Sequence, residues 1–140
     1  MFVLNLVTPE KKLVTELEIE ELLVPGFKGQ LGILPGHAPL VTTLTTGILK
    51  YRTKGSSTYS TFVVSWGYCE VHPGGVTVLA EVAQSLEEID RARAEEALKK
   101  ARAKLADPLI DLDQLDAMRR KIERNENRLA ALGIDSNQSH

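Results

Sequence analysis

The sequence predicts a protein of the β + α class, with a β-sandwich or flattened barrel over residues 1–86 and an α-helical hairpin over residues 87–140. Two observations predict this division. All seven aromatic residues and nine of the ten glycines lie in the first part, which carries six Lys/Arg and seven Asp/Glu, against eleven and twelve in the shorter second part. The hydrophobic period also changes, from two residues to three or four, near Ser85–Glu87.

The first strands are predicted from alternating apolar and polar residues. In "LVTELEIEELLV", residues 13–24, Leu17 and Ile19 share one face, whereas the other face carries Glu16, Glu18 and Glu20. Such a period of two places one face of a strand in the core and the other in water. The carboxylates are interpreted as a solvated strand face, with a binding stripe as the alternative.

Two hairpins follow in the first part. "ILKYRTKGSSTYSTFVVS" is interpreted as two strands around Lys54-Gly55-Ser56-Ser57, and "YCEVHPGGVTVLAE" as two more around Pro73-Gly74-Gly75. Glycine supplies the positive φ that tight turns demand. Several short strands with no helical period between them favour a sandwich or a flattened barrel.

The second part has the period of two helices, expected over about residues 87–105 and 111–132. Apolar residues recur at three-to-four spacing in "EEIDRARAEEALKKARAKL" and again in "DLDQLDAMRRKIERNENRLAALG". Ser85 is the expected N-cap of the first helix, and Asp107-Pro108 is expected to end it. Gly133 is the expected C-cap of the second helix, with a short polar tail after it.

Composition excludes several classes of function. A net charge of −2 and a pI near 5.9 provide no basic field for nucleic acid. The longest apolar runs fall far short of the roughly 18 residues that span a bilayer. The start, "MFVLNLVTPEKK", has no signal-peptide character and the single Cys69 has no disulfide partner, so a cytoplasmic protein is expected.

Candidate enzyme chemistry finds no support in the residues. Glycines 26, 29, 32 and 36 lack the spacing of a phosphate-binding loop, so structural turns are the favoured interpretation. The histidines lie far apart and the one cysteine adds no metal-ligand spacing, so no metal site is expected. No serine lies in a nucleophile elbow. Trp66 and Cys69 could mark a ligand pocket or reactive thiol, but apolar neighbours favour a buried core strand.

The second helix carries a basic ridge at Arg120, Arg124 and Arg128, with spacing i, i+4, i+8. A solvated face with ion pairs is the ordinary interpretation, and contact with a polyanion or an acidic protein surface is the sharper one. The first helix presents alanines where a core helix would present leucines. Its docking therefore buries little area, and the hairpin is expected to be able to move.

The run "GQLGILPGHAPLVTTLTTGIL", the segment "GYCEVHPGGVTVLAE" and the helix "EEIDRARAEEALKKARAKL" resemble the epsilon subunit of the bacterial F-type (rotary) ATP synthase, essentially end to end. The resemblance implies an antiparallel sandwich of about ten strands and an antiparallel helical hairpin. It also implies a non-catalytic subunit of the central stalk, or rotor, that couples the proton-driven ring to ATP synthesis. The subunit would be peripheral, at the cytoplasmic face of the bacterial inner membrane, and associated with the membrane only through the complex.

Partners and sites follow from the same resemblance. A sheet face would pack on the gamma subunit, and the loop from Gly29 would touch the ring of c subunits. The residues expected at the ring are Gln30, Gly32, His37 and Pro39.

The resemblance also implies regulation by movable C-terminal helices, which would inhibit ATP hydrolysis through contacts of Arg120, Arg124 and Arg128 with the alpha and beta catalytic subunits. Some members bind ATP as a regulatory ligand through an I/L-D-x-x-R-A motif, and no other cofactor is implied. The matching residues here are Ile89, Asp90, Arg93 and Ala94, with Arg124 and Arg128 facing the phosphates. A free-standing ATP-sensing module is the alternative function.

Overall fold

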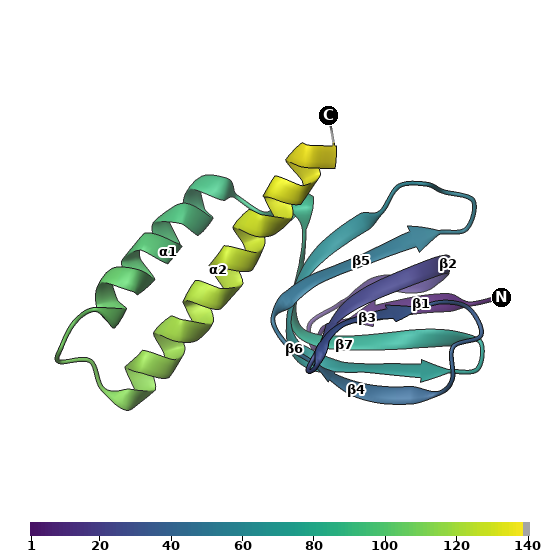
Figure 1. Cartoon of the computed structure of the whole chain (residues 1–140), viewed down its shortest axis with the longest axis horizontal. Helices are drawn as coiled ribbons and strands as arrows, with labels where there is room; N and C mark the ends of the chain where they lie inside the picture. Colours follow the sequence, from purple (N-terminus) through teal and green to yellow (C-terminus); the bar gives the residue numbers. More distant parts are fainter. Residues whose placement is uncertain (139–140) are drawn as a thin grey trace. The chain divides into compact units, whose positions relative to one another are not determined.

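The computed structural model describes residues 1–138 and the side chains of residues 1–133. The chain forms two compact units, Met1–Gln84 and Ser85–His140. The first unit is a β-sandwich and the second contains two helices that pack as a hairpin (Figure 1). The predicted fold class is therefore confirmed.

The sandwich has seven strands, connected in the order shown by the colours of Figure 1. They are β1 (Val3–Val7), β2 (Lys12–Gly26), β3 (Gly29–Ile33), β4 (Leu40–Leu44), β5 (Gly47–Thr53), β6 (Ser60–His72) and β7 (Gly75–Ser85). Their order is β1-β7-β6-β4-β2-β3, while β5 pairs with β2 and β6, and β1 also pairs with β2. These pairings close the sheet on itself, as in a flattened barrel.

One pairing differs from the antiparallel pattern that was expected. β1 and β7 run parallel, with Val3 opposite Gly75 and Val7 opposite Leu79, while the other pairings with a defined register are antiparallel. The first and last strands of the sandwich lie far apart in sequence. Two parallel strands cannot be joined by a tight turn, so no turn motif in the sequence indicates that they pair.

The strand count is seven because two long strands pass through bends. β6 pairs with β5 up to Val64 and with β4 from Gly67, and Trp66 between the two segments has a φ of 54°. β2 bends at Glu16, which has a φ of 47° and interrupts the register with β1. The bend in β6 lets one strand pair with two different neighbours, and the irregularity in β2 is a bulge within its pairing with β1.

The core of the sandwich is one continuous apolar cluster. Alternate residues of each strand face it, as expected from the period of two. Leu4, Leu22 and Val64 are fully enclosed, Ile19 and its neighbour Leu17 pack into the same cluster, and Cys69 lies among them. Because this cluster consists of residues of the first unit alone, the sandwich has its own core.

Cys69 is a buried, free thiol, and burial raises its pKa to about 12. The expected burial of Cys69 is confirmed. Because the thiolate is the reactive form, we expect this thiol to be inert. At pH 8 we expect the native chain to react with a disulfide reagent at least about a hundredfold more slowly than the unfolded chain. Absorbance of the released thiol measures both rates, and equal rates would contradict the burial of this side chain.

Trp66 differs from the expected buried core residue. Its side chain is 42% exposed. The cause is the bend in β6, which turns the strand at Trp66 and brings Gly67 against the backbone of β7. The sequence pattern predicts a continuous strand here. Tryptophan rarely adopts a positive φ, so the residue type gives no indication that Trp66 leaves the alternation of the strand.

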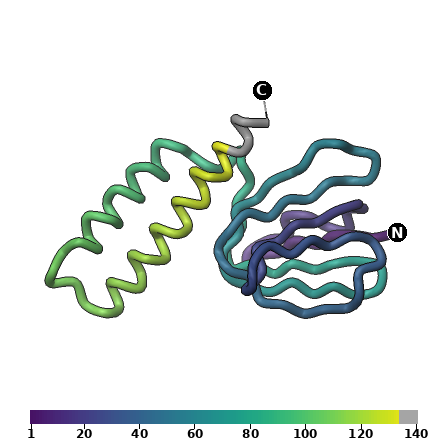
Figure 2. Tube along the Cα trace, in the orientation of Figure 1, coloured from purple at the N-terminus to yellow at the C-terminus, as the bar shows by residue number. Residues whose placement is uncertain are grey.

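The hairpin consists of α1 (Arg91–Leu105) and α2 (Leu112–Gln138), preceded by one 3₁₀ turn, Leu86–Glu88. Figure 2 traces α1 and α2 side by side, connected at one end by a short loop. α1 begins at Arg91 instead of residue 87, because Asp90 and not Ser85 caps it: Arg93 N donates to Asp90 Oδ1 at 3.1 Å. Ser85 Oγ donates instead to Glu88 Oε1 at 3.0 Å.

Gly133 is not a C-cap. α2 continues through it to Gln138, so most of the expected polar tail is helical, and its last two residues lie outside the described part. Glycine permits a left-handed C-cap but does not impose one. No proline follows Gly133 to stop the helix.

Candidate functional site

The glycine- and proline-rich stretch forms turns, as expected, and each turn has a clear cause. Leu34, Pro35, Gly36 and His37 make a type II turn, in which His37 N donates to Leu34 O at 3.0 Å and Gly36 has a φ of 88°. Proline fixes the first central position of such a turn, and glycine allows the second. A hydrogen-bonded turn therefore restrains residues 34–37 of the loop between β3 and β4.

The ring-contact residues expected from the family lie on and around this loop. Gln30, Gly32 and Pro39 are exposed, and His37 is half-buried. Gln30 and Gly32 belong to β3, where they lie opposite Pro25 and Leu23 of β2.

His37 is tied to its own loop. Its Nδ1 donates to the carbonyl oxygen of Ala38 at 2.7 Å, which leaves Nε2 as the ring nitrogen able to accept a hydrogen bond from a partner. The four residues thus form part of an exposed surface on a fixed backbone, where binding residues are commonly found.

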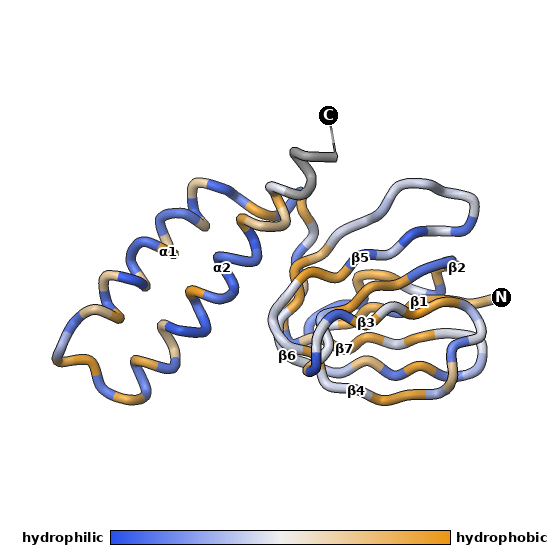
Figure 3. Tube along the Cα trace, in the orientation of Figure 1, coloured by the Kyte–Doolittle hydropathy of each residue, from blue (hydrophilic) through white to orange (hydrophobic). Residues whose placement is uncertain are grey.

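The hairpin contains the second candidate site, a cleft of about 700 Å³ between α1 and α2. Alanines of α1 give it one narrow apolar wall, and Met118 lies on the other side. Figure 3 shows both helices as largely hydrophilic, with apolar positions recurring along them. The lining includes a single carboxylate and six cationic side chains, namely Arg93, Lys100, Lys104, Lys121, Arg124 and Arg128.

Among the described side chains that line the cleft, cations outnumber carboxylates. The one carboxylate, Glu96, lies 3.7 Å from Lys100 Nζ, an exposed pair that neutralises one cation at most. The pKa of Arg128 is lowered, first by burial and second by the charge of Arg124. Mutual repulsion between partly desolvated cations is relieved when an anion binds between them. The chemistry of this cleft therefore suits a ligand with several negative charges.

The structure brings together some of the residues of the nucleotide motif and separates others. Arg93, Arg124 and Arg128 line the cleft together. Asp90 serves as the N-cap of α1, Ala94 is buried between the helices, and Ile89 ends the 3₁₀ turn, so these three do not line it. Arg120 also lies outside the lining, so the basic ridge on α2 divides, with Arg124 and Arg128 at the cleft.

Two cations of the cleft were missed in the sequence, Lys104 and Lys121. A signal for them existed. Positions 93, 97, 100 and 104 continue one stripe along α1, and positions 128, 125, 121 and 118 continue one along α2, at helical spacing. These stripes form one cationic site only because α1 and α2 face each other in the hairpin.

Asp90 should contribute to hairpin stability through its cap. An Asp90→Ala substitution leaves the amide of Arg93 without its acceptor and is expected to cost about 1 kcal/mol of helix stability. Thermal unfolding followed by circular dichroism at 222 nm measures the loss. Asp116→Ala, an exposed position inside α2, is the matched control and should change the melting curve little.

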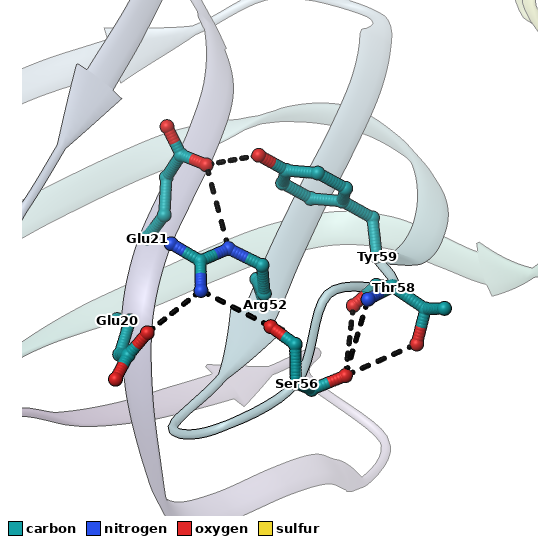
Figure 4. A network of polar contacts seen from close by, with 6 residues as sticks. All are labelled: Glu20, Glu21, Arg52, Ser56, Thr58 and Tyr59. Atoms are coloured by element: carbon teal, nitrogen blue, oxygen red, sulfur yellow. Dashed lines mark hydrogen bonds and ion pairs between the residues drawn. The ribbon is translucent and has the colours of Figure 1, made fainter.

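The glutamates of β2 form contacts within the sandwich. Arg52 Nη1 of β5 donates to Glu20 Oε2 at 2.7 Å and to the carbonyl oxygen of Ser56 at 3.1 Å (Figure 4). The hydroxyl of Tyr59 donates to Glu21, and this bond raises the pKa of the tyrosine. The network fixes the β5–β6 hairpin on β2.

Glu18 and Glu16 also pair within the sandwich. Glu18 lies 3.7 Å from Lys54 Nζ, and Glu16 exchanges two hydrogen bonds with the side chain of Asn5, on β1. The three carboxylates of the predicted strand face thus connect neighbouring strands, and none of them needs an external ligand to explain its place.

Two kinds of feature are absent from the described residues. Among residues 1–138, no helix is long and apolar enough to cross a membrane. Across the same residues, no group of three or more His, Cys, Asp and Glu side chains is placed to hold a metal ion.

The fold and the two sites define a class of protein: an interaction subunit, in which a rigid sandwich presents exposed loops and a separate helical hairpin presents a cationic cleft. Comparison with known proteins narrows the class. A family model described as the ATP synthase, Delta/Epsilon chain, beta-sandwich domain matches residues 1–86.

Curated relatives agree. The ATP synthase epsilon chain of Bdellovibrio bacteriovorus is 49% identical over 107 residues, 76% of either chain. That of Koribacter versatilis is 47% identical over 104 residues, 74% of this chain and 71% of the relative. The chain belongs to the family of ATP synthase epsilon chains, and its members are non-catalytic subunits.

Solved structures show the same fold. A chain in the cryo-EM structure of Euglena gracilis mitochondrial ATP synthase, OSCP/F1/c-ring, superposes with a TM-score of 0.84 at 29% identity, covering 94% of this chain and 81% of that one. A second, from the Tetrahymena thermophila mitochondrial ATP synthase central stalk/c-ring, has a TM-score of 0.59 at 18% identity and supports the fold alone.

Proposed function

We propose that this chain is a subunit of the central stalk of a bacterial proton-translocating ATP synthase, where it connects the rotating ring to the catalytic head. One observation carries the proposal: the sandwich has its own core and a fixed loop surface, while the hairpin is a separate unit. A stalk subunit needs a rigid part that transmits torque, and a regulatory subunit needs a second part that can move. The chain would then be peripheral, held at the cytoplasmic face of the inner membrane by its partners.

Within this proposal, Gln30, Gly32, His37 and Pro39 contact the polar loops of the c-subunit ring, and an outer face of the sandwich packs on the gamma subunit. Support comes from the exposure of this loop surface and from its fixed backbone. A rigid interface loses little conformational entropy on binding, which favours affinity for a given area.

The hairpin is the proposed regulatory element. Only three residues of α1, two of them alanines, are buried, so separating the two helices exposes little apolar surface. A modest change in free energy would then be enough to populate a second state of the hairpin. In that state, α2 contacts acidic surfaces of the alpha and beta subunits through Arg120, Arg124 and Arg128. The extended helices would obstruct rotation and inhibit hydrolysis.

Proton-driven ATP synthesis tests the coupling role. Inverted vesicles with the complete complex should synthesise ATP, and vesicles stripped of this subunit should lose synthesis and regain it when the purified chain is added back. Equal rates of ATP synthesis with and without the chain would contradict the proposed coupling role.

We further propose that the cleft of the hairpin binds ATP as a regulatory ligand, with Arg93, Arg124 and Arg128 at the phosphates. The six cations and the apolar wall support a ligand with both a polyanionic and a planar apolar part. This observation also favours a second candidate function, a free-standing ATP-sensing module, which differs in that it needs no gamma subunit.

Calorimetry on the purified chain tests the nucleotide site. ATP should release heat at millimolar concentration, and Arg124→Ala should weaken binding about tenfold or more, because it removes a charge-assisted hydrogen bond. Arg91→Ala, on α1 but outside the cleft, is the control and should bind ATP as the unaltered chain does. Absence of heat with the unaltered chain would dispose of the site.

A further inference from the structure

The apolar stripe of α2 is interrupted by one amide. Asn125 lies where the stripe continues in steps of three and four residues, as along the seam of a coiled coil. The apolar members of the stripe are Leu115, Met118, Ile122, Leu129 and Leu132. The Asn125 side chain is 3% exposed and lines the cleft between α1 and α2. Among the side chains described in residues 85–133, it is the only polar one that is buried.

The hydrogen bonds of this amide stay within α2. Asn125 Nδ2 donates to Lys121 O at 2.8 Å, and Asn125 Oδ1 accepts from Arg128 Nη1 at 3.0 Å. The buried residues of α1 are Ala94, Leu98 and Ala101, whose side chains carry no hydrogen-bonding group. The amide is therefore satisfied, but its bonds connect α2 to itself and not to α1.

Closing the hairpin therefore removes a polar group from water without giving it a new partner. Both hydrogen bonds of Asn125 can form in α2 whether or not α1 is packed against it, so closure does not gain them. The desolvation of the amide, in contrast, is a cost of closure alone. An apolar side chain at this position would have the opposite effect, because its burial favours packing of the two helices.

We propose that Asn125 keeps the closed hairpin separable, as a built-in weak point of the interface between α1 and α2. The cost of burying its amide lowers the free energy that holds the helices together, and the open state is populated more as a result. The proposal deepens the proposed regulatory role of the hairpin, and its consequence for ATP hydrolysis rests on that role. The stability of the closed hairpin can be measured on the chain alone.

Hydrogen exchange of the full chain tests the proposal with an Asn125→Leu variant. Leucine has the branched shape of asparagine, so it fills similar space without a polar atom. The readout is the amides of α1, whose sequence is unaltered. An isolated helix of 15 residues is marginal in water, so these amides exchange when the hairpin opens. We expect their exchange to slow about tenfold or more, as when a buried polar group is replaced by a well-packed apolar one.

Asn127→Leu is the matched control. Asn127 Nδ2 donates to Glu123 O at 2.8 Å, the same bond within α2 that Asn125 makes, but Asn127 is half-buried and does not line the cleft. Its replacement brings the same gain in helix propensity, so α1 exchange should change about twofold or less. Asn125→Met, with an unbranched side chain that adapts to irregular space, should slow exchange as Asn125→Leu does. Exchange as fast as in the unaltered chain, or faster, in both Asn125 variants would overturn the proposal.

Hydrolysis by the catalytic head separates this proposal from the regulatory role of the hairpin. Asn125→Leu should inhibit severalfold less than the unaltered chain, because its hairpin stays closed, and Asn127→Leu should inhibit normally. Slower exchange with undiminished inhibition would support the role of Asn125 in closure and contradict the regulatory role of the hairpin. Unchanged exchange with weaker inhibition would overturn the role of Asn125 and leave the regulatory role standing.

Discussion

Replacing Gly67 by alanine is expected to destabilise the sandwich by about 3 kcal/mol, the upper part of the range for overpacking. A Cβ at this position would lie 1.9 Å from the carbonyl oxygen of Leu79 and 2.9 Å from Cα of Ala80. Both contacts are with the backbone of β7, which cannot rotate away as a side chain could. Relief requires β6 and β7 to separate at the bend, and this disturbs the core on both sides.

Chemical denaturation of the full chain measures the loss as a lower transition midpoint with little change in slope. Gly32→Ala is the control, since its Cβ would meet only Leu23 Cδ2 at the ordinary distance of 3.5 Å. We expect its stability to stay within about 0.5 kcal/mol of the unaltered chain. Similar midpoints for the two variants would contradict the close approach of β6 to β7.

Removing residues 87–140 is expected to abolish inhibition of ATP hydrolysis and to leave binding to the gamma subunit intact. The reason lies in the division of the molecule: the core belongs to the sandwich, while the cationic side chains of α2 belong to the hairpin. Steady-state hydrolysis by the catalytic head should fall severalfold when the full chain is added and stay unchanged with the shortened one.

A substitution separates the charge of α2 from its bulk. The variant Arg120→Ala/Arg124→Ala/Arg128→Ala keeps the helix, because alanine has the highest helix propensity, but removes the ridge. We expect it to inhibit less than the unaltered chain. Full inhibition by this variant would show that the hairpin inhibits without these three arginines. Inhibition by the shortened chain would show that the sandwich, and not the hairpin, inhibits hydrolysis.

The sequence predicted those parts of the fold that depend on local periodicity. Leu17 and Ile19 face the core because alternation leaves a strand only one apolar face. The turn at Pro35-Gly36 was predicted because proline fixes φ at the first central position and glycine tolerates the positive φ of the second. The two helices were also predicted, but α1 begins at Arg91, directly after Asp90, whose side chain caps it.

Other features depend on contacts between distant residues and were not predicted. The parallel pairing of β1 with β7 joins the two ends of the sandwich. The bend at Trp66 depends on β6 crossing between layers, which no residue near it signals. At the hairpin, Lys104 and Lys121 become part of a cationic cleft only when α1 and α2 face each other.

The proposed stalk function requires the sandwich to bind the gamma subunit. Light scattering during size-exclusion chromatography of the purified chain mixed with the gamma subunit of the same organism measures whether the two proteins form a complex. We predict one complex with a single copy of each, formed by the full chain and by residues 1–86, with and without ATP. Separate elution of the two proteins, or a complex that requires ATP, would contradict the claim and favour a free-standing nucleotide sensor.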